Sequence, residues 1–185
     1  IATYQLSRDG SRLLVPLSGR LFAIERKSGR KVELPDEGGY PIDPRLSPDG
    51  NSVAVVREGD LYVIDVESGQ QRRLTENASD THSNGLAEFV AQEEMGRFHG
   101  FWWSPDSRRI AYQSADVSDG ETLFISEPTA PNKPAQSWRY PRPGKNNAVV
   151  KLFITSIDGG EPVEVSWDRD RYPYLATVRW EEGAP

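Results

Sequence analysis

Hydrophobic and polar residues alternate along most of this chain, which is the pattern of half-buried β-strands. A clear example is the strand pattern LYVIDV at residues 61–66, which is followed by a hairpin turn at Ser68-Gly69. Glycine suits such a turn because it tolerates positive φ. Residues 70–74 are then expected to form a short outer strand. The pattern predicts an all-β chain of short antiparallel strands.

The alternating pattern repeats every 40 residues. The turn sequence SRDG at 7–10 returns as SPDG at 47–50, where Asp and Gly suit the turn geometry. The register continues through the pairs Ile24 and Ile64, Ser28 and Ser68, and Leu34 and Leu74. A period near 40 with several short strands per unit predicts the blades of a β-propeller.

Two insertions interrupt the repeat. The third turn, SPDS at 104–107, comes 57 positions after the second instead of 40. The third unit then resumes only at residues 149–154, after a stretch with prolines at 128, 131, 134, 141 and 143. Such prolines favour an ordered excursion over a central strand.

These positions predict how the whole chain, residues 1–185, is divided. It is a fragment of a β-propeller, with about three four-stranded antiparallel blades and one short inserted helix. The expected blades are about residues 1–40, 41–80 and 100–165, with the start of a further blade at 174–185. The helical insertion is about 81–99 and the Pro-rich insertion about 115–147.

The first insertion contains the only helical pattern in the chain. Apolar Leu86, Phe89 and Val90 recur at helical spacing, so we expect a short helix near residues 87–95. Asn84 is the predicted N-cap, and Gly96 and Gly100 are the predicted stops.

Glu93 and Glu94 lie at the end of this predicted helix and admit two interpretations. One is a solvated helix end in which either acid pairs with Arg97 at i+4 or i+3. The other is a site that binds a cation. An ammonium has three donors and no acceptor, so two carboxylates satisfy it well. Their place on an insertion that leaves the blade favours binding.

Composition narrows the function classes. The chain has a net charge of −6 and no basic stripe, which disfavours a nucleic-acid partner. No apolar run is long enough to span a membrane, and the absence of Cys excludes disulfides and thiolate chemistry. No cofactor is expected, and His82 and His99 are too isolated to bind a metal. Since the chain begins at Ile1, we expect a segment of a longer protein.

Outside the acid pair, the sequence contains no catalytic motif and few other candidate functional residues. No G-x-S-x-G motif and no Ser-His-Asp set is apparent, so no catalytic residue is expected in this segment. Trp102 and Trp103 face opposite sides of a strand, one toward the blade core and the other toward the insertion. The sequence RYPRPG at 139–144 is interpreted as the return path into the blade, although it could bind a partner.

The chain resembles the propeller domain of dipeptidyl peptidase IV-type serine exopeptidases, of the prolyl oligopeptidase superfamily. The resemblance is specific over about residues 45–160, through NGLAEFVAQEEMGRFHGFWWSPDSRRIAYQ and RYPRPGKNNAVVKLFI. It implies an eight-bladed propeller followed by an α/β-hydrolase domain that contains the serine nucleophile. It also implies that Glu93 and Glu94 hold the N-terminal ammonium of a peptide, and that peptide substrates and the hydrolase domain are the partners.

The resemblance leaves other properties open. A homodimer is kept open as a further partner, and a periplasmic or secreted location is only implied by the resemblance. Family members also use an arginine from an earlier blade against the substrate, but the short loop around Arg20 does not support that role. Two alternatives remain: a non-enzymatic propeller scaffold for protein contacts, and the propeller of a related endopeptidase or acyl-peptidase.

Overall fold

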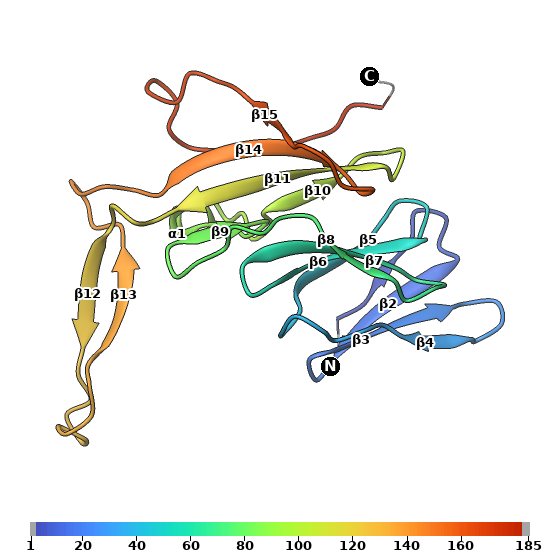
Figure 1. Cartoon of the computed structure of the whole chain (residues 1–185), viewed down its shortest axis with the longest axis horizontal. Helices are drawn as coiled ribbons and strands as arrows, with labels where there is room; N and C mark the ends of the chain where they lie inside the picture. The colour runs from blue at the N-terminus through green and yellow to red at the C-terminus, as the bar shows by residue number, and fades with distance from the viewer. Residues whose placement is uncertain (1–2, 183–185) are drawn as a thin grey trace.

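Three antiparallel sheets follow one another along an arc in the computed structural model, which describes residues 3–182 (Figure 1). This confirms the predicted all-β class and the propeller-like fragment. A single short helix, α1 (Phe89–Glu93), occurs in the described residues. Within residues 3–182 no helix is long and apolar enough to cross a membrane.

The first two sheets are four-stranded meanders of the same design. Each strand pairs with the next one in sequence, as expected where short turns join neighbouring strands. The first sheet comprises β1 (Gln5–Leu6), β2 (Arg12–Leu17), β3 (Arg20–Glu25) and β4 (Lys31–Glu33). The second comprises β5 (Ile42–Leu46), β6 (Ser52–Arg57), β7 (Asp60–Asp65) and β8 (Gln71–Arg73).

The third sheet is the one that both insertions interrupt. Its four blade strands are β10 (Phe101–Trp103), β11 (Arg109–Asp116), β14 (Val149–Ser156) and β15 (Val163–Val165). The first insertion adds a fifth strand, β9 (His82–Asn84), which pairs with the end of β11. The second insertion forms a separate hairpin of β12 (Glu121–Ile125) and β13 (Gln136–Tyr140), which we call the arm; it projects away from the blades (Figure 1).

The repeated turns share one hydrogen-bond pattern. Ser7 Oγ donates to Asp9 at 2.6 Å, and the equivalent bond joins Ser47 and Asp49 at 2.6 Å. The same bond joins Ser104 and Asp106 at 2.5 Å. In each turn the Asp carboxylate also accepts a backbone N–H two residues later, which fixes the turn that starts the blade's second strand.

The core lies between the blades. Val53 and Val55 of β6 pack toward the first sheet, whereas Ala54 and Val56 pack toward the third sheet, where they join Phe101. All four β6 residues are fully buried because the middle sheet is covered on both faces. Each blade therefore depends on its neighbours for burial of its apolar faces.

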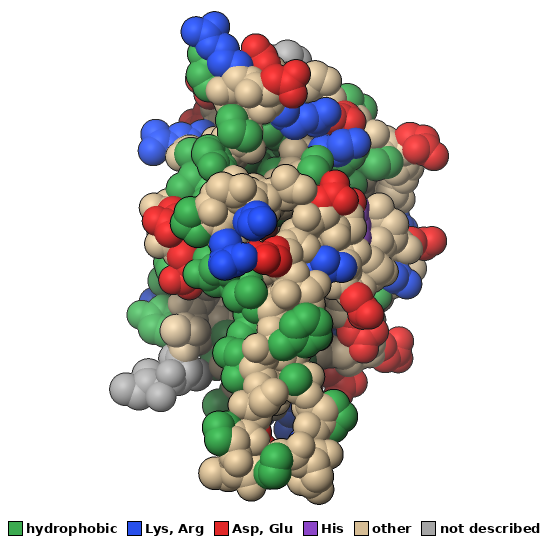
Figure 2. Space-filling model, turned by 90° about the vertical axis from the view of Figure 1, so that its left-hand side faces the viewer, with side chains coloured by type: hydrophobic (Ala, Val, Ile, Leu, Met, Phe, Trp, Pro, Cys, Tyr) green, Lys and Arg blue, Asp and Glu red, His purple; other side chains and the backbone are tan. Residues whose placement is uncertain are grey.

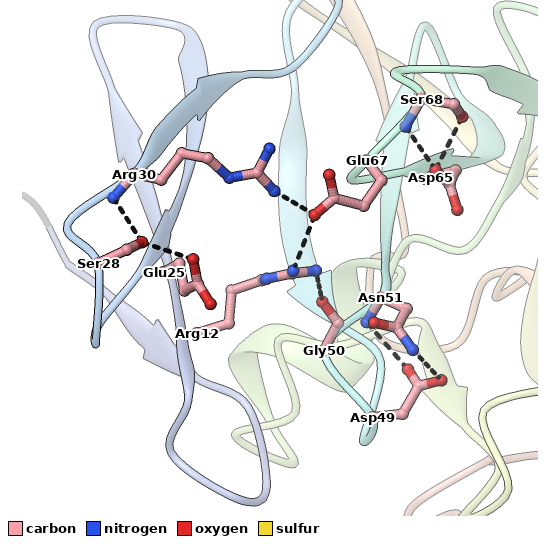
Figure 3. Close-up of polar contacts among 10 residues, drawn as sticks. All are labelled: Arg12, Glu25, Ser28, Arg30, Asp49, Gly50, Asn51, Asp65, Glu67 and Ser68. Carbon is pink, nitrogen blue, oxygen red and sulfur yellow. Dashed lines mark hydrogen bonds and ion pairs between the residues drawn. The ribbon is translucent and has the colours of Figure 1, made fainter.

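Polar contacts join the first two blades at the edge shown in Figure 3. Arg12 Nη1 donates to the Gly50 carbonyl at 2.7 Å, and its Nη2 lies 3.5 Å from Glu67. Arg30 also pairs with Glu67. These side chains are partly or largely exposed, so the ion pairs add little stability beyond fixing the relative register of the blades.

The start of the helix differs from the sequence prediction. Asn84 is not the N-cap: it lies in β9, and its backbone N–H donates to the Gly59 carbonyl at 2.7 Å. Glu88 is the N-cap, with extended backbone angles. The helix is also shorter than the predicted range 87–95, since it ends at Glu93, while Gly96, a predicted stop, has φ of +61°.

The last described residues run along the third blade without forming a strand. Leu175 is buried there, and Trp180 Nε1 donates to the Trp102 carbonyl at 3.1 Å. The predicted start of a further blade at 174–185 extends over residues 183–185, which lie outside the described part of the chain. That boundary stays a prediction.

Candidate functional site

Helix α1 lies beside β9 at the third blade, and in the chain it comes between β9 and β10 (Figure 1). Its first turn is closed by Glu88, whose Oε2 accepts the backbone N–H of Ala91 at 2.7 Å. Ala91 is fully buried, which turns that side of the helix toward the protein. A five-residue helix is too short to be stable alone, so these contacts determine where it lies.

Glu93 and Glu94 occupy the C-terminal end of α1, as the last helical residue and the C-cap. Both are exposed, and within residues 3–182 neither carboxylate has an ion-pair partner. No basic residue lies in the last turn of the helix. Adjacent acids at a helix C-terminus are electrostatically unfavourable, because the helix dipole places partial negative charge there. The pair is therefore suited to accept a cation.

Arg97 does not form the ion pair with Glu93 or Glu94 that its spacing predicts. Its guanidinium is buried, with 8% of the side chain exposed, and it faces Glu88 at 3.5 Å. Burial lowers the pKa of Arg97, while the nearby Glu88 charge raises it. Its planar group also lies over the Trp102 ring, 5.7 Å from the centroid. The sequence did not indicate Glu88 as the partner of Arg97, because the i+4 and i+3 spacings pointed to Glu93 and Glu94 instead.

Two backbone segments of the first insertion, at Gly85-Leu86 and at Gly100, lie very close together next to β10. A Cβ on Gly100 would lie 2.4 Å from the carbonyl carbons of Gly85 and Leu86. Gln113 on β11 joins both sides of this approach: its N–H donates to the Gly100 carbonyl, and its carbonyl accepts from Gly85, both at 2.7 Å. The segment before α1 and the segment after it are thus held together.

The arm contacts the helix at its base, its strands expose apolar side chains, and its tip carries an exposed ion pair between Lys133 and Glu127. Phe89 of α1 and Tyr140 of β13 form an edge-to-face pair with ring centroids 4.8 Å apart. Farther out, Phe124, Ile125 and Trp138 are exposed. Figure 2 shows the arm extending downwards, with a surface that is mostly hydrophobic or uncharged.

The other candidate residues take structural positions. Trp102 and Trp103 face opposite sides as predicted: Trp102 packs with the cluster around Val150, and Trp103 packs between the second and third blades. Arg20 pairs with Glu33 in its own blade. His99 Nδ1 lies 3.0 Å from Asp43, which joins the end of the insertion to β5.

His82 lies in a groove of about 730 Å³ between the second and third blades. Its Nε2 is 3.0 Å from Ser114 Oγ, and Asn84 and Tyr112 also line the groove. Burial, together with the nearby Asp60 charge, raises the pKa of Tyr112 to about 12. Within the described residues no cluster of acidic, His or Cys side chains could hold a metal ion. Neither Glu93 nor Glu94 lines this groove.

Two dipeptidyl peptidases are similar in sequence to about half of the chain. The chain is 33% identical over 104 residues to human dipeptidyl peptidase 8, and the aligned region covers 48% of the chain and 12% of that protein. It is 30% identical over 103 residues to mouse inactive dipeptidyl peptidase 10, covering 52% of the chain and 13% of that protein. The chain thus spans about an eighth of the length of these relatives.

A solved structure and a family model cover nearly the whole chain. The crystal structure of Porphyromonas gingivalis dipeptidyl peptidase 4 matches with a TM-score of 0.76 and 21% identity, over 94% of this chain and 26% of that one. This likeness shows the fold. The family model for the dipeptidyl peptidase IV N-terminal region matches residues 7–184, beyond the 45–160 in which the sequence motifs are specific. The chain therefore belongs to the dipeptidyl peptidase IV N-terminal region family.

Proposed function

We propose that this chain is the substrate-recognising propeller part of a dipeptidyl peptidase IV-like serine protease that removes dipeptides from peptide N-termini. Glu93 and Glu94 bind the free N-terminal ammonium of the substrate. The serine nucleophile comes from an α/β-hydrolase domain outside this segment. The observation that supports this most strongly is the exposed acid pair at the end of α1, which has no ion-pair partner within residues 3–182.

The pair fits an ammonium in charge and in hydrogen bonding. A primary ammonium donates three hydrogen bonds, and two carboxylates can accept them in a charge-assisted arrangement. The substrate charge also offsets the repulsion between the acids and the unfavourable helix dipole at this end. An N-acetylated peptide has neither the charge nor the three donors, so the same site disfavours it.

Holding the ammonium also sets the length of the product. In an extended peptide, two residues span about 7 Å between the N-terminus and the scissile bond. A fixed anchor for the amine at that distance from the nucleophile positions the second peptide bond for attack. The propeller would thus set the length of the released peptide, and the hydrolase domain would cleave the bond.

Single substitutions in the complete protein test this role. Glu93→Gln and Glu94→Gln should each lower kcat/KM for a free-amine dipeptidyl substrate. A charged hydrogen bond contributes about 1.5–3 kcal/mol, so the loss should be roughly ten- to a hundred-fold. The fold should survive because both side chains are exposed and the amide is nearly isosteric.

Glu37→Gln is the matched control, since Glu37 is also exposed but lies in the loop between the first two blades. It should leave kcat/KM unchanged. If both helix variants keep the kcat/KM of the parent, the pair is a solvated helix end and the proposal fails.

A second candidate function is a non-enzymatic propeller scaffold for protein contacts. The match to mouse inactive dipeptidyl peptidase 10 favours it, because a member of this family is named as inactive. A downstream hydrolase domain with an intact G-x-S-x-G turn would decide for the enzyme. The same domain with the serine replaced would decide for the scaffold.

A further inference from the structure

We propose that Arg97 is a positioning residue that locks helix α1 against the third blade and so fixes where Glu93 and Glu94 present their carboxylates. This inference rests on the proposed role of the acid pair in binding the substrate ammonium. Arg97 itself is buried and acts through the helix.

The guanidinium joins four separate parts of the site. Its Nε donates to the Leu175 carbonyl at 3.0 Å, and its Nη1 donates to the His99 carbonyl at 2.7 Å. Its Nη2 donates to Gln113 Oε1 at 2.6 Å and lies 3.5 Å from Glu88. A planar fork with directional donors can hold such an arrangement, whereas an ammonium on a flexible stem cannot.

The contacts form a continuous path from the sheet to the helix. Gln113 is fully buried in β11, and its amide also donates to the Leu86 carbonyl at 3.0 Å. From Gln113 the path runs through Arg97 to Glu88, whose other oxygen caps the first turn of α1 at Ala91. A rigid blade strand thereby determines the position of a helix that is too short to hold itself.

The arrangement also leaves the acid pair free for a ligand. Arg97 is three and four residues from the two acids, at a spacing where a helical ion pair would form. All three of its nitrogens instead face the interior partners described above. The buried position of Arg97 thus holds the helix in place without neutralising Glu93 and Glu94.

Arg97→Lys in the complete protein is the primary test, because it keeps the charge and removes the fork. We expect KM for a free-amine dipeptidyl substrate to rise about ten-fold, since a small misplacement of binding groups is costly. The change in kcat should be smaller. Arg57→Lys is the matched control: Arg57 is also buried, with 1% exposed, but it donates to the Pro35 carbonyl at 2.7 Å in a distant loop. It should lower thermal stability without raising KM.

A double-mutant cycle separates this inference from the proposed function. If Arg97 acts through the acid pair, Arg97→Lys should change kcat/KM by less than about two-fold when it is introduced into the Glu93→Gln, Glu94→Gln double variant. If the effects multiply instead, Arg97 acts independently and the inference is overturned while the function of the pair stands. If the Gln variants alone leave kcat/KM unchanged, both the function and the inference fail.

Glu88→Gln covers the case in which Arg97→Lys does not fold. The amide oxygen can still accept the Ala91 N–H, so the helix cap survives while the charge facing Arg97 is lost. It should raise KM in the parent and have little further effect in the Glu93→Gln, Glu94→Gln double variant. An unchanged KM in a folded Glu88→Gln protein would contradict the inference.

Discussion

Asp60 and Asn84 join the second blade to the first insertion: the Asn84 side-chain amide donates to the buried Asp60 carboxylate at 2.9 Å. Asp60 also accepts from Thr75 Oγ1 at 2.6 Å and pairs with Arg73. Burial alone would raise the pKa of Asp60, but hydrogen bonds from Arg73, Thr75 and Asn84 hold it below its usual value. This carboxylate fixes β9, and therefore the segment that leads into α1.

Replacing Asp60 should be strongly destabilising. Asp60→Ala removes the acceptor of Thr75 Oγ1, the partner of Arg73 and one of the two acceptors of the Asn84 amide. We expect the free energy of unfolding of the complete protein to fall by about 3 kcal/mol. Urea unfolding followed by fluorescence measures this. Glu67→Ala, which removes an exposed acid, should cost less than about 1 kcal/mol. Equal losses in the two variants would show that Asp60 is not the organising group.

Gly100→Ala tests the close approach within the insertion. The new Cβ would meet backbone atoms of Gly85 and Leu86 at 2.4 Å, and backbone cannot move aside as a side chain can. We expect a loss of about 1–3 kcal/mol or more in unfolding free energy. Gly144→Ala is the control, because its Cβ would meet no atom within 4 Å and only the positive φ of +78° opposes it. Gly100→Ala should cost more; the reverse order would contradict the geometry.

Tyr112 should make stability sensitive to alkaline pH. Its pKa in the folded protein is raised to about 12 by burial and by Asp60, whereas an unfolded tyrosine has a pKa of about 10. The neutral phenol therefore stabilises the fold fully below pH about 10, and this contribution is lost as pH rises from about 10 to 12. The parent should lose about 2 kcal/mol more than Tyr112→Phe across this range. Parallel stability curves for the two proteins would contradict the shifted pKa.

The isolated chain should be catalytically silent. No nucleophile constellation is apparent in its sequence, and positioning of a substrate amine does not by itself cleave an amide. Purified residues 1–185 should release no chromophore from a dipeptidyl-anilide substrate. Turnover that a serine-reactive phosphonate abolishes would contradict this expectation.

The repeat made most of the fold predictable from sequence. The SRDG, SPDG and SPDS turns use the same local Ser-to-Asp bond in each blade, so their positions set the strand order without long-range information. The late return of the third blade at Val149 was also predictable, because its strand pattern resumes there. Local patterns succeed where local contacts decide the structure.

The details of the site depend on distant contacts and were predicted less well. Asn84 has the chemistry of an N-cap, but Asp60, 24 positions away, binds its amide and holds it in β9 instead. Glu88 is an uncommon capping residue, so only its contacts with Ala91 and Arg97 reveal the role. Glu93 and Glu94 could be named as candidates because two adjacent acids in an insertion form a local signal, and their role in binding stays a prediction.

The most direct test of the proposed function is discrimination between a free and an N-acetylated dipeptidyl substrate in the complete protein. We expect the parent to prefer the free amine by about a hundred-fold or more in kcat/KM, because acetylation removes the charge that the acid pair binds. In the Glu93→Gln, Glu94→Gln double variant the preference should largely disappear through loss of activity on the free amine. A parent protein that cleaves both substrates equally well, or a double variant that keeps the full preference, would contradict the assignment of this pair as the amine-binding site.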